Sequence, residues 1–182
     1  MKMKIAAFIA VWICHLAIAD SETNIIRNSG FESGTIGWKL ERGDAVIESG
    51  DAQTGKRFVR VIDMSDEDTH IFQSRHFPAR PGGKYTPSVQ VRSKSKGGQG
   101  IYLAFFNASG ARITNENVRA SGPTIEWKAI SLSSTVPDEA ATVMVYLYSY
   151  LKDVGTYDFD DVSLLVEGGR ESPSALSLKP SK

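Results

Sequence analysis

Short apolar segments with a period of two recur along most of this chain. Within residues 84–92, Tyr85, Val89 and Val91 fall on one face, whereas the alternate positions are polar. This alternation is typical of a β-strand with one buried face. No window of helical length shows a convincing period of 3.6 residues. The segments predict strands near 24–28, 45–49, 57–63, 69–77, 84–92, 100–106, 126–136, 142–150 and 156–166.

Turn residues separate these segments, as in the stretches 80–83, 96–98, 108–110 and 136–138. Short strands joined by regular turns, without helices, predict an all-β fold built as an antiparallel β-sandwich. The pattern predicts one domain, over 20–166, and a chain of this size suits a single core. Residues 167–182 lose the pattern and are expected to form a flexible tail. We expect a monomer.

The N-terminal segment has the features of a secretory signal. Two lysines precede the apolar run 5–19, which ends in Ala17-Ile18-Ala19. This arrangement predicts a signal peptide over 1–19, cleaved before Asp20, and a protein that is secreted, extracellular or periplasmic. The run is shorter than the roughly 20 residues of a membrane span, but an uncleaved anchor is the alternative.

Cysteine and charge narrow the possible partners. The only cysteine, Cys14, lies inside the predicted signal, so a core or a metal must stabilise the exported domain without disulfides. Loss of Lys2 and Lys4 with the signal leaves two more acidic than basic side chains. Since no basic run is present either, neither nucleic acid nor a membrane is expected as a partner after cleavage.

Two segments near the ends of the predicted domain place carboxylates beside apolar residues. Glu32 follows Phe31 within the sequence Asn-Ser-Gly-Phe-Glu-Ser-Gly at 28–34, and Asp160 alternates with Val162 in the last strand. That alternation predicts that Asp160 points inward, where a lone charge is too costly to leave unpaired. We therefore expect the first and last strands to be adjacent and to share a bound cation.

Several landmarks, taken in order, resemble the carbohydrate-binding modules of families 4, 9 and 22 and, more widely, the galactose-binding-like jelly rolls. They are 28–32 with Gly37-Trp38, then 54–56, Gln73, 80–86, 126–128, 136–137 and 160–164. The resemblance implies a jelly-roll β-sandwich that binds a poly- or oligosaccharide, in assistance of glycoside hydrolases. Other members of the superfamily have lost sugar binding, so a structural or surface-interaction module is the alternative.

The resemblance also implies a structural calcium ion, Ca²⁺. Its ligands would be the side chains of Glu32 and Asp160 with the carbonyls of Gly30 and Gly55, and Asp161 would replace Asp160 if the register shifts by one. Calcium prefers such a set of oxygen ligands. The alternative is that Glu32 accepts backbone hydrogen bonds while Asp160 pairs with Lys56 or Arg57.

The sharpest sign of a binding site is a row of tyrosines. In segment 143–150 the odd positions are apolar, whereas the even positions include Tyr146, Tyr148 and Tyr150. Only one face of a sandwich strand can meet the core, and an open aromatic face usually binds something. Tyrosine suits sugars because its ring stacks on C–H groups while its hydroxyl forms hydrogen bonds.

Other residues complete this predicted binding face. Gln90 and Arg92 are expected on the same concave sheet, and Tyr102 is expected to extend the platform. The alternative is that a long loop at 107–125 covers the tyrosines. Trp38 and Trp127 are expected in the core. No nucleophile motif, phosphate loop or triad is visible, so the sequence predicts a protein that is not an enzyme.

Overall fold

The computed structural model describes residues 23–150 and 153–170, and these residues form strands without any helix. One sheet contains β1 (Trp38–Arg42), β4 (Ile71–Ser74), β5 (Phe77–Pro78), β7 (Gly98–Phe106), β8 (Arg112–Ser121) and β11 (Thr142–Ser149). The other contains β2 (Asp44–Ser49), β3 (Arg57–Asp63), β6 (Lys84–Ser93), β9 (Thr124–Ser131), β10 (Ser134–Thr135) and β12 (Gly155–Glu167).

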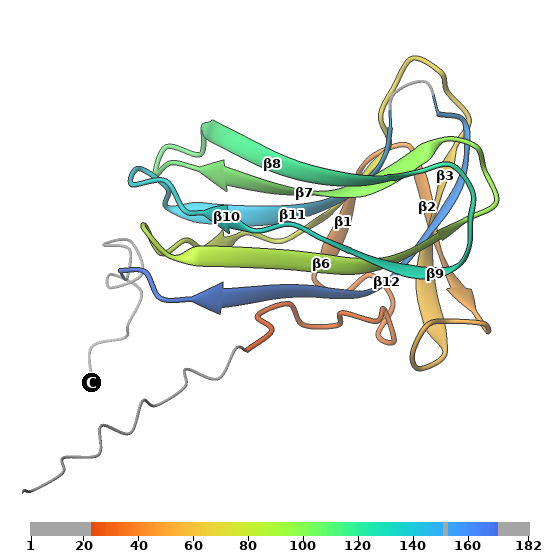
Figure 1. The fold of residues 1–182 in the computed structure, drawn as a ribbon, viewed down its shortest axis with the longest axis horizontal. Helices are drawn as coiled ribbons and strands as arrows, with labels where there is room; N and C mark the ends of the chain where they lie inside the picture. Colours follow the sequence, from red (N-terminus) through yellow and green to blue (C-terminus); the bar gives the residue numbers. More distant parts are fainter. Residues whose placement is uncertain (1–22, 151–152, 171–182) are drawn as a thin grey trace, which may run out of the picture.

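The two sheets stack as layers and every strand pair is antiparallel. The first sheet has the order β1-β4-β11-β7-β8, and the second has the order β10-β6-β12-β3-β2, with β9 also paired to β6. Figure 1 shows β7, β8 and β11 in the upper layer and β6, β9 and β12 in the lower layer. The predicted all-β antiparallel sandwich is therefore confirmed.

The core lies between the inner faces of the two sheets. Val143, Val145 and Leu147 on β11 are fully buried there, as the alternation predicts, with Val91 on β6 and Phe159 on β12. At one side, an aromatic cluster joins the N-terminal segment to β1 and β4, because Phe31 and Phe72 both pack against Trp38, with ring centroids 5.3 and 5.6 Å from it. The expectation that Trp38 lies in the core is confirmed.

Five segments differ from the predicted strands, and two of them, 69–77 and 126–136, are each divided into two strands. Both β1 and β8 were not predicted, because they are edge strands whose mostly exposed side chains show no apolar alternation. The segment 24–28, in contrast, is not a strand. It still runs beside β12, where Ile25 N–H donates to the Leu164 carbonyl (3.1 Å), so the expected adjacency of the two end segments is confirmed.

The predicted signal peptide and most of the predicted tail lie outside the described residues, although β12 extends one residue further than expected, to Glu167. Within the described ranges, no helix is long and apolar enough to cross a membrane.

Candidate functional site

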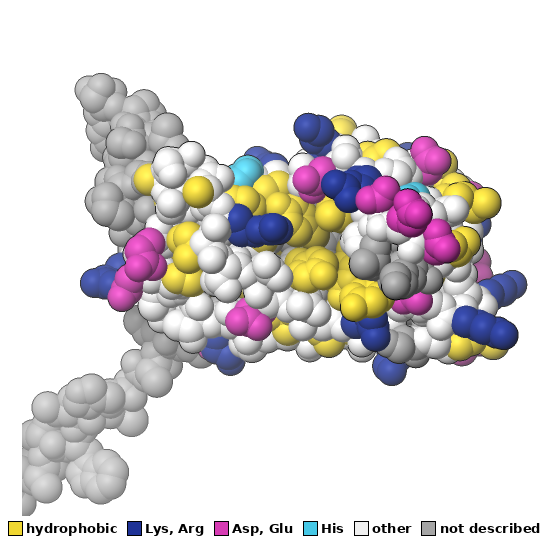
Figure 2. All heavy atoms as spheres, turned by 90° about the horizontal axis from the view of Figure 1, so that it is seen from above, with side chains coloured by type: hydrophobic (Ala, Val, Ile, Leu, Met, Phe, Trp, Pro, Cys, Tyr) yellow, Lys and Arg dark blue, Asp and Glu magenta, His cyan; other side chains and the backbone are white. Residues whose placement is uncertain are grey.

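The outer face of the first sheet carries a second group of packed apolar side chains. Ala104, Phe106, Met144 and Tyr146 form a buried cluster there, against which Tyr102 packs. Figure 2 looks down on this sheet and shows a band of hydrophobic side chains across the middle of the face, with charged side chains around it. No described strand forms a third layer over it. We call this surface, the outer side of β4, β7, β8 and β11, the aromatic face.

Cross-strand register arranges the aromatic face in rows. One row runs from β8 to β1 through Asn117, Tyr102, Tyr146, Gln73 and Lys39. Side chains directly opposite each other in a sheet lie within contact distance. The row therefore places two aromatic rings side by side, with an amide on each flank and a lysine at one end.

Tyr148 lies in the neighbouring row and supports Tyr102. It is only 1% exposed, and its ring centroid lies 4.2 Å from that of the partly exposed Tyr102. Gly100, directly opposite, has no side chain, and a Cβ there would come within 2.7 Å of the Tyr148 ring. Burial raises the pKa of the Tyr148 hydroxyl, with a further contribution from Tyr102. Tyr148 is thus a buried ring that supports Tyr102 from below the aromatic face.

The other two predicted tyrosines differ in exposure. Tyr146 is 8% exposed, and burial raises the pKa of its hydroxyl. Tyr150, just beyond β11, is 43% exposed, and the guanidinium of Arg119 lies 4.0 Å from its ring centroid. Of the tyrosines on this side of the sheet, Tyr102 and Tyr150 therefore have ring surface open to a ligand, while Tyr146 is almost fully buried.

The alternative of a covering loop is wrong for most of segment 107–125. Residues 112–121 form β8, which pairs with β7 along its edge and widens the sheet. Its outward residues Asn115 and Asn117 are exposed and line the aromatic face. Sequence reasoning missed them, and also Gln73 on β4 as part of this face, because isolated polar residues give no apolar signal.

The predicted calcium residues do come together. Glu32 Oε1 accepts hydrogen bonds from the backbone N–H groups of Lys56 (2.7 Å) and Arg57 (2.8 Å), and a Cβ on Gly55 would collide with the Glu32 carboxylate. At Gly30, a Cβ would lie 3.4 Å from Asp160 Oδ1. We call Gly30, Glu32, Gly55, Asp160 and Asp161 the end clamp.

Asp160 is fully buried, but the predicted reason is wrong. Its pairing with Gln90 places it on the outer side of β12, and a bulge before Ser163 separates it from the core residue Val162. The neighbouring Asp161 has the left-handed φ of 47°. The loop at 53–54 covers Asp160 instead, where Gln53 N–H donates to Oδ2 (2.9 Å).

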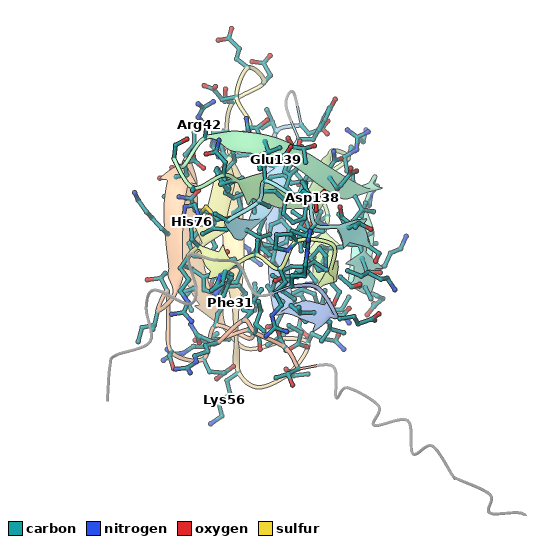
Figure 3. The ribbon with its side chains drawn as sticks, turned by 90° about the vertical axis from the view of Figure 1, so that its left-hand side faces the viewer. Phe31, Arg42, Lys56, His76, Asp138 and Glu139 are labelled. Carbon is teal, nitrogen blue, oxygen red and sulfur yellow. The ribbon has the colours of Figure 1, made fainter. Side chains whose placement is uncertain are left out.

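The end clamp gathers three carboxylates, and its one contact with a cationic side chain is to the Glu32 carbonyl, which accepts from the Arg57 guanidinium (3.2 Å) among the described residues. Asp160 forms no ion pair within the described part of the chain, and Figure 3 shows Lys56 extending away from the body of the domain. Burial raises the pKa of Asp160 to about 6, and Asp161 adds to the increase. Phe31 is also strained, with φ of 58°. The expected pairing of Asp160 with Lys56 or Arg57 is therefore not formed, whereas the backbone bonds of Glu32 are.

The carboxylates of the end clamp suit a hard cation. Calcium takes carboxylate and carbonyl oxygens, and Glu32, Asp160 and the Gly30 and Gly55 backbone supply both. Within residues 23–150 and 153–170, however, no group of three or more histidine, cysteine, aspartate or glutamate side chains is arranged to hold a metal. A calcium ion here would thus depend on backbone carbonyls or water for part of its ligand set.

Comparison with known proteins identifies the family. The family model described as "Carbohydrate binding domain", which covers modules of types 4 and 9, matches residues 23–153. The chain belongs to this family. Exochitinase 1 of Streptomyces olivaceoviridis is 26% identical over 161 residues, which are 87% of this chain and 24% of the exochitinase. The chain thus spans about a quarter of the length of this curated relative.

Solved structures of carbohydrate-binding modules share the fold of this carbohydrate-binding domain. A family 22 xylan-binding domain has a TM-score of 0.61 at 18% identity, covering 82% of this chain and 97% of that domain. The Clostridium thermocellum xylanase 10B structure, solved with xylohexaose and containing a family 22 module, also has a TM-score of 0.61, at 19% identity, covering 77% of this chain and 28% of the other. At these identities the likeness shows the fold alone.

Gln90 and Arg92 of this carbohydrate-binding domain do not share the tyrosine sheet, so that expectation is wrong. Both point outward from β6, in the opposite sheet. The side chain of Arg92 lies 4.3 Å from the Trp127 ring centroid and donates to Asp51 and Asp158. Trp127 is likewise not in the core but partly exposed on this outer surface.

The surface around Arg92 forms a pocket of about 530 Å³ in which Asp51 and Asp158 pair with the lining arginines. Asp158 receives two hydrogen bonds from Arg60, at 2.7 and 3.0 Å, and two from Arg92, at 3.3 and 3.1 Å. Both guanidinium groups also pack near the Phe58 ring. Such a paired network stabilises an outer sheet surface, and it engages every nitrogen of both guanidinium groups within the domain.

Proposed function

We propose that this carbohydrate-binding domain binds a poly- or oligosaccharide on the aromatic face and is not itself an enzyme. The observation that supports it most is the row Asn117, Tyr102, Tyr146 and Gln73, with rings in the middle and amides on both sides. No described strand covers this face, and an apolar sheet face without a covering layer usually marks a binding surface.

Sugar chemistry matches this arrangement of side chains. The C–H face of a pyranose can stack on the open ring of Tyr102, while the amides of Asn117 and Gln73 bond its hydroxyl groups. Each stacked ring contributes about 1 kcal/mol, so two rings give millimolar binding or weaker, and added hydrogen bonds bring it to around micromolar. Gln90 and Arg92, on the other sheet, have no part in this site.

The glycan itself is identified by a binding panel. Xylan, chitin, mixed-linkage glucan and galactan are tested by affinity electrophoresis or pull-down, since similar folds occur in a xylanase and sequence similarity extends to an exochitinase. Binding to at least one glycan supports the proposal. If no glycan in a broad array binds, the alternative of a structural or surface-interaction module is favoured.

The predicted signal and the family together support a location and a partner. We infer that the domain acts outside the cytoplasm, because the sequence begins with a predicted secretory signal and the curated relative is a chitinase. There it would hold a glycan close to a glycoside hydrolase and so assist hydrolysis, as an accessory domain with no catalytic groups of its own.

We also propose that the end clamp binds a structural calcium ion, and removal of this ion is expected to destabilise the domain. With EDTA at pH 7.5 the melting temperature should fall by several degrees, because a bound ion stabilises the folded state by mass action. Restoring calcium, but not magnesium, should reverse the fall. An unchanged melting temperature would contradict the calcium site.

The calcium effect should also depend on pH through Asp160. In the metal-free domain the pKa of Asp160 is raised from 3.8 to about 6. The free energy of unfolding therefore decreases as the pH rises from about 4 to 6. Calcium binds the ionised carboxylate, and its binding compensates this loss of stability above pH 6. The melting-temperature difference between calcium and EDTA should therefore shrink at pH 5. A larger difference at pH 5 than at pH 7.5 would exclude Asp160 as a ligand.

A further inference from the structure

A separate pocket at one end of the sandwich carries an unusual excess of positive charge. Its volume is about 630 Å³, and it lies between the N-terminal segment, the stretch 75–80, the start of β6 and the end of β12. Three arginines line it, Arg27, Arg75 and Arg80, and none of the described residues that line it is acidic. Figure 3 faces the domain from the left side of Figure 1. Its labelled His76 lies in the stretch 75–80, and its labelled Asp138 lies in the turn after β10.

None of these arginines has an ion-pair partner within the described residues. The nearby acidic residues are engaged elsewhere, since Asp138 pairs with Arg170 (2.9 Å) and Glu167 with Lys84 (3.8 Å). All three side chains are exposed, so three guanidinium groups around one cavity are accessible to an anion from solution. In the pocket around Arg92, by contrast, carboxylates compensate the guanidinium groups.

Part of the pocket wall is apolar, where Ile25, Pro78 and Val166 lie beside two buried rings. Phe77 and Tyr85 are almost fully buried, and the Tyr85 hydroxyl donates to the Pro78 carbonyl (3.0 Å), which fixes the ring. The guanidinium carbon of Arg75 lies 5.2 Å from the Phe77 ring centroid. A ligand of this pocket thus meets apolar surface as well as positive charge, which a small inorganic anion would not use.

We propose that this pocket binds an acidic saccharide unit, a sugar that carries a carboxylate or a sulfate ester. Guanidinium groups bind carboxylate and sulfate in paired N–H···O contacts, so Arg27, Arg75 and Arg80 supply the anion recognition. The apolar C–H surface of the sugar ring packs against Ile25, Pro78 and Val166. The pocket is a second saccharide site, distinct from the aromatic face, and it gives the domain a preference for glycans with acidic substituents.

Calorimetric titration with trigalacturonate tests this inference. The R75Q/R80Q variant should bind it on the order of tenfold more weakly than the wild type, because two charge-assisted contacts are lost. The K96Q/K128Q variant, which removes two exposed lysines elsewhere, should bind like the wild type. Binding should weaken at high salt, since the contacts are ionic. Equal affinity of R75Q/R80Q and wild type would overturn the inference.

Two further ligands separate an acidic sugar from a simple anion. The fully methyl-esterified trisaccharide should not bind to this pocket, and inorganic sulfate should bind much more weakly than trigalacturonate. Sulfate binding as strong as that of trigalacturonate would overturn the saccharide assignment. A Y102A variant should keep its affinity for trigalacturonate, so the outcome is independent of binding on the aromatic face.

Discussion

Replacing Asp158 by alanine is expected to lower the free energy of unfolding by about 3 kcal/mol. Asp158 is 8% exposed and accepts hydrogen bonds from both Arg60 and Arg92, whose side chains are 32% and 13% exposed. Hydrogen bonding to Asp158 raises the pKa of Arg60, as expected for a guanidinium held by a carboxylate. Without it, two largely desolvated cations face each other across β3, β12 and β6.

Urea denaturation of the D158A and D51A variants measures this effect. Asp51 also pairs with Arg92, at 2.6 Å, but its side chain is 89% exposed. An exposed ion pair contributes at most about 1 kcal/mol, so D51A should be nearly as stable as the wild type. A D158A domain within about 1 kcal/mol of the wild type would show that this network does not stabilise the second sheet.

Replacing Tyr102 by alanine should weaken glycan binding by a factor of about ten or more. Its ring is partly exposed at the centre of the aromatic face, rests against Tyr148 and lies between Asn117 and Tyr146 in the cross-strand register. Removal of the Tyr102 ring eliminates the stacking surface and lets water reach the buried Tyr148 ring beneath it. The fold should persist, because Tyr102 is not part of the core between the sheets.

Isothermal titration of three variants with the best glycan of the panel measures this prediction. Y102A should lose affinity, whereas Y148F should keep it, since the Tyr148 hydroxyl is buried. The matched control is W127A, which removes an aromatic ring of the opposite sheet, and its affinity should be unchanged. Wild-type affinity in Y102A would place the site elsewhere.

The sequence predicted most of the sandwich because its central strands are amphipathic. Period-two alternation located β6 and β11 and assigned Val143, Val145 and Leu147 to the core. Alternation cannot assign a strand to one sheet or the other, however. For this reason Gln90 and Arg92, correctly placed on an outward face, were attributed to the wrong sheet.

In the end clamp, a local irregularity of β12 makes the prediction from alternation wrong. Strict alternation would put Asp160 on the side of Val162, but the bulge inserts an extra residue and reverses the assignment. Asp160 is buried nonetheless, because a loop more than 100 residues earlier in the chain donates its backbone N–H groups to the carboxylate. The sequence around Asp160 gives no sign of the bulge or of the loop contact. Gly30 and Gly55, in contrast, mark positions where the backbone lies close to a carboxylate.

Chemical-shift mapping tests the central claim, glycan binding on the aromatic face, most directly. A ¹⁵N-labelled domain is titrated with xylohexaose or with the hexasaccharide that binds best in the panel. We predict that the amide signals that move belong to the outer side of the first sheet, around Gln73, Tyr102, Asn117 and Tyr150. Movement confined to the surface around Arg92 and Trp127, with the aromatic face unchanged, would contradict the account.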